Sequence, residues 1–419
     1  MCSAGSCLAF LIAQVVFLMN YSEQQTTAIM ENGATFETEI NVDEVMKKFV
    51  IEFYTKRFVD GQNIVVAPLT IYRVFMSLYG SMDASAKFDL HSLADIPQDV
   101  SPEKMTEIEH YVRNHTLPVG DKLSLAETRL YFDKSVGKAR SDFGTNNLKP
   151  IATRLTEKQA FCQQVNDWIR NPPVNGTDDL VHDYDLNNET QAFIVGALSI
   201  DWDTQLHPSS DDKRFQGETV KYLEGSISTG YAKLENLKAE VVELTNDRLV
   251  GVKLWIIMPD KASSIKEFND QLSVESIRQI ERGLTGQKVD VKLALPMVTI
   301  EYNSQEDAYV MEVFEVFSSL FTKPSVKLVD GKDDLYSIKN FLMKCILRVV
   351  GEDTAKSKAQ TTTGAAAVTF DRPFVLMILS KDGSVPLLMA NYFSPTDKLR
   401  ALEAMERRMK AAAKEHMDL

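Results

Sequence analysis

The side chains of this chain that could carry catalysis form no recognisable catalytic set. The histidines include no H-E-x-x-H pair, so their spacing gives no basis for zinc-assisted hydrolysis. No G-x-S-x-G turn is present that would expose a nucleophilic serine. The run GLTGQK at Gly283–Lys288 lacks the adjacent Gly-Lys pair of a phosphate-binding loop and is typical of a turn that ends a helix. We therefore expect no enzymatic activity, no cofactor and no metal.

The overall composition bounds the class of protein and its partners. Of the 419 residues, 44% are hydrophobic and 25% are charged, as in a soluble globular protein. The formal net charge of -13 argues against nucleic acid as the main partner, because phosphate binding needs clustered lysine and arginine. Beyond the first stretch of the chain the cysteines are Cys162 and Cys345. We expect both to pack as small apolar residues.

The first residues have the pattern of a secretory signal. The apolar run from Cys7 to Met19 is too short to cross a bilayer, and residues 1–22 fit a signal peptide although the usual basic start is missing. An alternative is that translation begins at Met19. Motifs for asparagine glycosylation agree with secretion. They lie at Asn20, Asn114, Asn175 and Asn188. We expect a secreted, extracellular glycoprotein without a membrane span.

Helix-like and strand-like stretches follow one another without regular alternation. Apolar residues recur at helical spacing in the segments 42–59, 68–78, 103–112, 159–170, 263–272, 274–284 and 306–321. Strand-like runs occupy 63–67, 123–132, 191–200, 249–259, 289–302, 340–350, 374–379 and 385–393. Helices come early and strands dominate late, which indicates an α+β protein. The absence of an interior linker or repeat favours one domain over residues 42–395.

The tail, residues 396–419, differs from the rest of the chain. Its apolar residues share one helical face, and basic residues cluster nearby. The apolar residues are Leu399, Leu402, Met405, Met409 and Ala412, and the basic ones are Arg407, Arg408, Lys410 and Lys414. We expect a helical C-terminal extension that is solvated. The alternative is a segment that docks on a partner or on an anionic surface.

One polar stretch lies between two strand-like runs. Residues 349–374 read VVGEDTAKSKAQTTTGAAAVTFDRPF, and the part between the strands is rich in Thr, Ala and Gly. Such a run has too little apolar surface to pack, so we expect an exposed loop fixed at both ends. Binding chemistry is often found on loops of this kind, although the segment could also be a simple connector.

Taken together, these segments resemble the serpin family. NIVVAPLTIYRVFMSLYGSMDAS is similar to the serpin strand-Pro-helix segment, and VNDWI, QAFIVGALSIDW, WIIMPD, LPMVTIEY and KCILRV match serpin landmarks in the right order. The closing stretch FDRPFVLMILSKDGSVPLLMANYFSP is the most specific. The resemblance covers the chain from about Val42 to Pro395. It implies a single α+β domain with three β-sheets, about nine helices and an exposed reactive-centre loop.

The resemblance also assigns a role to the polar stretch. In serpins that inhibit proteases, the reactive-centre loop is cleaved and then inserts as a new strand in the central sheet, which traps the protease. By this resemblance, Thr354–Thr369 is the reactive loop. The family hinge reads Glu-x-Gly-Thr followed by small residues. The matching positions here are Gly351, Glu352, Asp353 and Thr354, and the residues after them include Lys356 and Lys358.

The two lysines oppose insertion of this loop. Side chains of a strand alternate between its faces, so if Thr354 points inward, Lys356 and Lys358 do as well. An unpaired ammonium group is costly to bury. The loop is also shorter than is usual in the family. Counting from the hinge puts the expected scissile bond at Ala367-Val368, close to the next strand.

A second departure concerns the polar shutter beneath the central sheet, which governs sheet opening in the family. The positions that match its two serines, its asparagine and its histidine are Ala67, Thr70, Gly196 and Met343. The polar network is therefore lost or replaced by apolar packing.

The departures lead to a prediction of function. We predict a secreted monomer with weak or absent protease trapping, which acts as a binding protein, a decoy or a protease substrate. Its partner would be an extracellular serine protease or another protein. The alternative is a working serine-protease inhibitor that is cleaved near Ala367-Val368 by an elastase-like enzyme, or at Lys356 or Lys358 by a trypsin-like one.

Overall fold

The computed structural model describes most of the chain between residues 40 and 396. The described residues are 40–115, 124–141, 143, 148–171, 179–187, 189–246, 249, 251–286, 288–304, 318–351, 366–380 and 385–396. The chain divides after Asn41, and the description concerns the unit Val42–Leu419. Within the described ranges, no helix is long and apolar enough to span a membrane. The predicted signal peptide and the extension beyond Thr396 lie outside the described residues.

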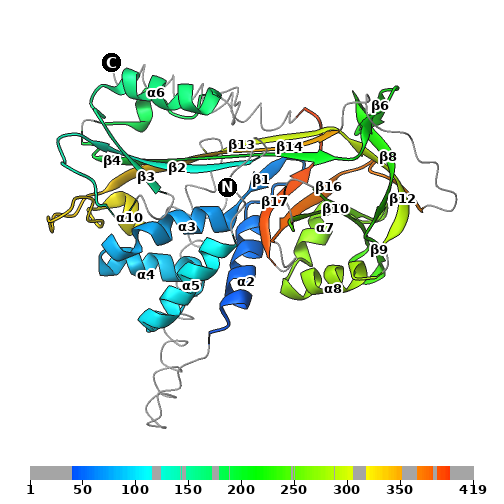
Figure 1. The fold of residues 1–419 in the computed structure, drawn as a ribbon, viewed down its shortest axis with the longest axis horizontal. Helices are drawn as coiled ribbons and strands as arrows, with labels where there is room; N and C mark the ends of the chain where they lie inside the picture. Colours follow the sequence, from blue (N-terminus) through cyan, green and yellow to red (C-terminus); the bar gives the residue numbers. More distant parts are fainter. Residues whose placement is uncertain are drawn as a thin grey trace, which may run out of the picture. The chain divides into compact units, whose positions relative to one another are not determined.

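A five-stranded sheet is the central layer of this unit (Figure 1). Its strands lie in the order β13-β14-β4-β2-β3. They are β2 (Ser124–Asp133), β3 (Leu148–Thr153), β4 (Ala192–Thr204), β13 (Val298–Asn303) and β14 (Ile338–Gly351). The two longest strands, β4 and β14, are far apart in the sequence and pair in parallel. Both are covered on two faces, which explains their nearly unbroken apolar runs.

Two further sheets and a short ribbon complete the β-structure. A six-stranded sheet has the order β1-β17-β16-β11-β10-β9, and a four-stranded sheet has the order β15-β12-β8-β5. The first comprises β1 (Ile64–Val66), β9 (Tyr231–Leu234), β10 (Ala239–Thr245), β11 (Lys253–Pro259), β16 (Phe374–Leu379) and β17 (Pro386–Tyr392). The second comprises β5 (His207–Pro208), β8 (Tyr222–Thr229), β12 (Val289–Pro296) and β15 (Ala366–Thr369). The ribbon pairs β6 (Lys213–Phe215) with β7 (Glu218–Val220).

Helices cover both faces of the central sheet. The described residues hold α2 (Val42–Thr55), α3 (Pro68–Leu78), α4 (Ala84–Leu93), α5 (Pro102–Asn114), α6 (Lys158–Arg170), α7 (Ile265–Asp270), α8 (Val274–Leu284) and α10 (Ser318–Thr322). The buried cluster under α6 includes Leu342 and Ile346 of β14. On the other face, the ring of Phe75 in α3 meets that of Phe341, with centroids 5.6 Å apart. Even-numbered residues of β14 therefore face α6, and odd-numbered ones face α3.

The α+β class and the single-domain arrangement expected from the sequence are confirmed, with one correction to the elements. The segment 289–302 is not one strand, because β12 and β13 belong to different sheets. The chain changes sheets at Met297, which is 41% exposed and whose N–H donates to the carbonyl of Lys221. The apolar alternation continues across this change, so the sequence does not mark it. Of the helix expected at 306–321, residues 306–317 lie outside the described residues.

Candidate functional site

The boundary between β14 and β4 lies beside the start of the stretch that, by the resemblance, would insert as a strand in the central sheet. The two strands pair directly, from Phe341 opposite Ile194 to Gly351 opposite Thr204. We call this boundary the seam. The stretch expected to be the reactive loop leaves β14 at Gly351 and returns at Ala366, the first residue of β15. An added strand could enter here only if β14 and β4 separate, and the pairing closes the seam along this span.

The inner face of the seam, which faces α3, is lined by buried apolar side chains. From β14 these are Met343, Cys345, Leu347 and Val349, and from β4 they are Leu198, Ile200 and Trp202. The indole N–H of Trp202 is buried and has no hydrogen-bond partner among the residues that the structure describes. No side chain of this set carries a charge, so these residues offer no counter-ion to a cation placed against them.

Two of the four predicted shutter positions meet across the seam. Gly196 lies opposite Met343, and a Cβ added to Gly196 would be 3.3 Å from Cγ of Met343 and 3.6 Å from the ring of Phe341. The methionine side chain thus packs where a side chain at position 196 would begin. Ala67 and Thr70 lie at the start of α3, where Ala67 precedes the first turn without a side-chain cap. Packing of Met343 against Gly196 is therefore apolar at this point of the sheet.

The hinge end of the seam is closely packed. A Cβ on Gly351 would lie 2.7 Å from the carbonyl oxygen of Leu206 and 2.7 Å from Cδ2 of Leu223. Next to it, the hydroxyl of Thr204 donates a hydrogen bond of 3.0 Å across the seam to the carbonyl of Val350. The first hinge position therefore has no room for a side chain. The other predicted hinge positions, residues 352–358, lie outside the described residues.

The candidate scissile bond lies within a strand. Ala367 and Val368 belong to β15, where they pair in parallel with Lys292 and Leu293 of β12. Val368 is only 2% exposed. A protease could reach this bond only after β15 separates from β12. Cleavage at Ala367-Val368 stays a prediction, and it requires this separation.

One of the predicted glycosylation sites lies at the end of a described helix. Asn114 is exposed at the end of α5, while Asn175 and Asn188 lie outside the described residues. Glycosylation itself stays a prediction. Cys162 and Cys345 are both buried, as the sequence predicts, and neither forms a disulfide within the described ranges.

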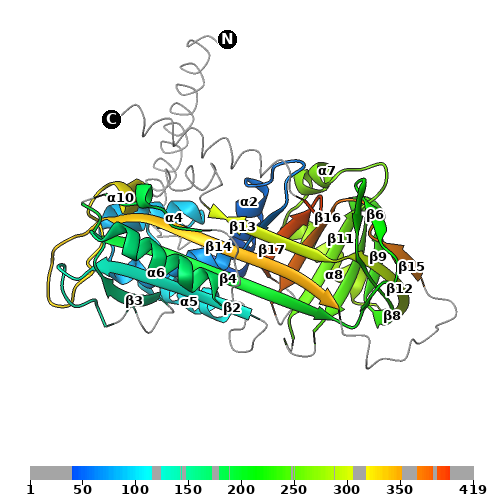
Figure 2. The same ribbon diagram turned by 90° about the horizontal axis from the view of Figure 1, so that it is seen from above.

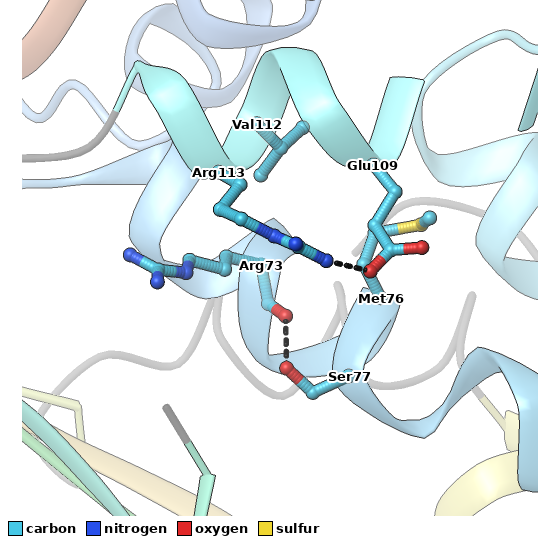
Figure 3. Close-up of a pocket in the computed structure, with 6 residues that line it drawn as sticks. All are labelled: Arg73, Met76, Ser77, Glu109, Val112 and Arg113. Atoms are coloured by element: carbon cyan, nitrogen blue, oxygen red, sulfur yellow. Dashed lines mark hydrogen bonds and ion pairs between the residues drawn. The ribbon is translucent and has the colours of Figure 1, made fainter. Parts of the chain in front are cut away.

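A small hollow lies between α3 and α5 (Figure 3). It is lined by Arg73, Met76, Ser77, Glu109, Val112 and Arg113. The guanidinium of Arg113 pairs with Glu109 of the same helix, and the hydroxyl of Ser77 donates to the carbonyl of Arg73 at 2.9 Å. Burial and the nearby charge of Arg113 lower the pKa of Arg73. The residues that line the hollow belong to α3 and α5 and not to the seam strands. Their types and contacts do not indicate a catalytic site.

Comparisons with known proteins agree with this architecture. A family model described as Serpin (serine protease inhibitor) matches residues 44–395. Leukocyte elastase inhibitor A of Mus musculus is 22% identical over 363 residues, which cover 80% of this chain and 93% of that protein. Two other relatives match over 66% and 65% of their own lengths.

Solved structures share the fold at low identity. SRPN18 from Anopheles gambiae superposes with a TM-score of 0.69 at 14% identity, covering 85% of this chain and 99% of that one. Human thyroxine-binding globulin, solved in complex with thyroxine, gives a TM-score of 0.68 at 17% identity, covering 85% of this chain and 98% of that one.

Proposed function

The chain belongs to the serpin family, and we propose that it is a secreted member with weak or absent protease trapping. In this proposal it acts as a binding protein, a decoy or a protease substrate. The observation that carries the proposal is the mismatch between the apolar inner face of the seam and the two lysines that the loop would bring to it.

The mismatch follows from the alternation of side chains. If the loop entered the sheet with Thr354 pointing inward, Lys356 and Lys358 would point the same way. They would meet the face formed by residues such as Leu347 and Ile200, both fully buried. Each buried ammonium group would cost several kcal/mol without a counter-ion, according to the general behaviour of buried charges. Insertion has to supply the driving force of trapping, and this cost opposes it.

The packing at both ends of the seam supports the same proposal. Near the hinge, Gly351 packs so closely against the backbone of Leu206 that a side chain would not fit there. Lower in the sheet, Met343 packs directly against Gly196. Opening the seam would break the apolar contact of Met343 with Gly196 and disturb the close packing around Gly351, and well-packed contacts of this kind are costly to lose.

Features of the sequence and the family support the proposed location and partners. The apolar stretch near the start of the chain and the exposed Asn114 support secretion and glycosylation. The family description, serine protease inhibitor, supports a serine protease as a partner, which would be extracellular if the chain is secreted. Human thyroxine-binding globulin is a neighbour in fold that binds a small molecule, which supports ligand binding as a role open to this fold. We further propose that the chain is a monomer without enzymatic activity.

A second candidate function is inhibition of a serine protease. It is favoured by the name of a relative, leukocyte elastase inhibitor A. In this case an elastase-like enzyme would cut near Ala367-Val368, and β15 would first have to separate from β12. Cleavage by a trypsin-like enzyme at Lys356 or Lys358 would leave little of the loop on the hinge side to form a new strand.

One experiment separates the two candidates. The purified full chain is incubated with trypsin-like and elastase-like proteases at near-stoichiometric ratios, and the products are examined on denaturing gels and by thermal unfolding. We expect loop cleavage without a protease adduct and without a rise in Tm. An SDS-stable adduct at near-stoichiometric yield would overturn the proposal and establish the second candidate.

A further inference from the structure

We infer that Arg348 and Asp201 form a clamp across the outer face of the seam, which holds β14 against β4 and opposes their separation. The inference deepens the proposed function, on which it rests, because it names side chains that act against sheet opening. It concerns the closed sheet itself, and it can be tested without any protease.

The contacts of the clamp join the two strands directly. Arg348 lies opposite Asp201 in the parallel pairing. Its Nη1 is 2.9 Å from Oδ1 of Asp201, and the same nitrogen is 3.4 Å from the hydroxyl of Ser199. One guanidinium on β14 therefore donates to two side chains of β4. Among the described residues, this is the ion pair that crosses the seam.

The clamp begins where the cover by α6 ends. Figure 2 shows α6 over the first part of β4 and β14, with both strands continuing beyond it. Under the helix, the outer face carries Val195 and Ala197 from β4 and Leu342 and Ile346 from β14, which belong to one buried cluster. The next outward positions are Ser199, Asp201 and Arg348. Beyond the part of the sheet that α6 covers, the side-chain contacts between β14 and β4 on the outer face are therefore polar.

Partial burial makes the pair stronger than an ordinary surface ion pair. The side chains of Arg348 and Asp201 are 19% and 33% exposed. Water screens such a pair less than a fully exposed one. An inserted strand would move β14 away from β4 by about 4.8 Å, the usual spacing between strands. The contact at 2.9 Å could not survive that movement without rearrangement.

Strand β14 is also tied on its other edge. Nζ of Lys344, which is 1% exposed, lies 3.3 Å from Oε2 of Glu301 in β13. This pair joins β14 to the strand that need not leave it when the seam opens. The two ion pairs therefore have different roles, since the Lys344 pair stabilises the sheet whether the seam is open or closed, and the Arg348 pair exists only when it is closed.

The test is hydrogen exchange of the seam amides in the intact protein. We compare Arg348→Met, Asp201→Asn and the double variant with the unmodified chain, following peptides that cover 342–351 and 192–204. Each single change should speed exchange at these amides by about three- to tenfold, and the double variant should add little to either. Exchange in the β2–β3 pair should not change.

A matched control is the ion pair between Lys253 and Glu243, which joins two strands of the six-stranded sheet at 3.2 Å. Lys253→Met should leave exchange at the seam unchanged. The inference is overturned if Arg348→Met affects the seam no more than Lys253→Met does, or if exchange rises equally in every strand. If a protease adduct forms while the seam amides respond as expected, the proposed lack of trapping fails and the clamp stands.

Discussion

Met343 packs against Gly196 across the closed seam, with its Cγ 3.3 Å from the point where a Cβ on Gly196 would lie. These two positions match the asparagine and the histidine of the serpin shutter, and here they form an apolar contact between two strands. A glycine and a methionine at opposite positions are complementary in volume, because the long side chain of one fills the space left by the other.

Truncating Met343 should therefore be costly. Met343→Ala would leave a cavity beside Gly196, and we expect a loss of about 2–5 kcal/mol in the free energy of unfolding, measured by urea denaturation. Gly196→Ala in the same chain should recover part of that loss, because its Cβ enters the vacated space. Met297→Ala is the control: Met297 is 41% exposed, and its removal should change stability by less than about 0.5 kcal/mol.

Gly351 should not tolerate a side chain. Gly351→Ala places a methyl group 2.7 Å from the carbonyl oxygen of Leu206, and a backbone atom cannot move aside cheaply. We expect a destabilisation of about 1–3 kcal/mol together with faster hydrogen exchange at the end of β14. The control is Gly80→Ala, because no atom lies within 4 Å of the added Cβ there. Equal stability of the two variants would show that the hinge end is looser than these distances indicate.

The sequence predicted the seam strands well but not how they meet. The unbroken apolar runs of β4 and β14 are strong signals for buried strands, and Pro68 marks the start of α3 correctly. The pairing of the two strands could not be predicted from the sequence. Arg348 and Asp201 lie 147 residues apart, and in the sequence each is a charged residue near the end of an apolar run. Nothing local fixes the parallel register that places them opposite each other.

The predicted shutter shows the same limit. Ala67, Thr70, Gly196 and Met343 match the shutter positions of the family, and the loss of polar groups there can be read from the residue types. The direct packing of Met343 on Gly196 depends on side-chain direction and on register, which become defined only in the folded sheet. The boundary at Met297 was missed because the apolar alternation runs on through it.

The buried thiol of Cys162 should make stability fall at alkaline pH. Burial, aided by the neighbouring Asp183, raises the pKa of Cys162 to about 12. In the unfolded chain the thiol ionises near its ordinary value of about 8.5, so the unfolded state releases its proton first as the pH rises. The Cys162 thiol therefore makes its full contribution to the free energy of unfolding below about pH 8, and this contribution declines progressively toward pH 12.

This effect can be isolated by removing the thiol. Urea unfolding from pH 7 to pH 10.5 should show a steeper loss of stability for the unmodified chain than for Cys162→Ala. Parallel slopes for the two proteins would contradict the burial of this thiol. A thiol reagent at pH 8 should also label Cys162 slowly in the folded protein and rapidly after unfolding, because the thiolate is the reactive form.

Asn114 provides a test of secretion that is independent of the seam. Expressed with its own first residues in cells that glycosylate secreted proteins, the chain should leave the cell and lose mass when treated with a peptide N-glycosidase. Asn114→Gln should reduce that loss by one glycan. His115→Ala is a matched control, because it keeps the acceptor motif and removes only the ring that stacks on Tyr111 at 4.0 Å. Retention of the unmodified chain inside the cell would contradict the proposed location.

The loop lysines provide the most direct test of why trapping should be weak. If charge is the obstacle, replacing Lys356 and Lys358 by alanine removes the buried ammonium groups from an inserted strand and favours insertion by several kcal/mol. After cleavage in the loop by an elastase-like protease, the double variant should gain thermal stability, and the unmodified chain should not. Adding Arg348→Met should speed the gain without changing the final Tm, because the clamp exists only in the closed sheet.

The control for this experiment is Lys292→Ala. It removes a lysine from β12, opposite Ala367, and places no change in an inserting strand. It should leave the response to cleavage as in the unmodified chain. If the double lysine variant still gains no stability, charge is not the obstacle, and the close packing of Gly351 and Met343 becomes the remaining explanation. Combining the lysine replacements with Met343→Ala would then test the packing explanation. Because this change loosens the contact with Gly196, the cleaved triple variant should gain thermal stability.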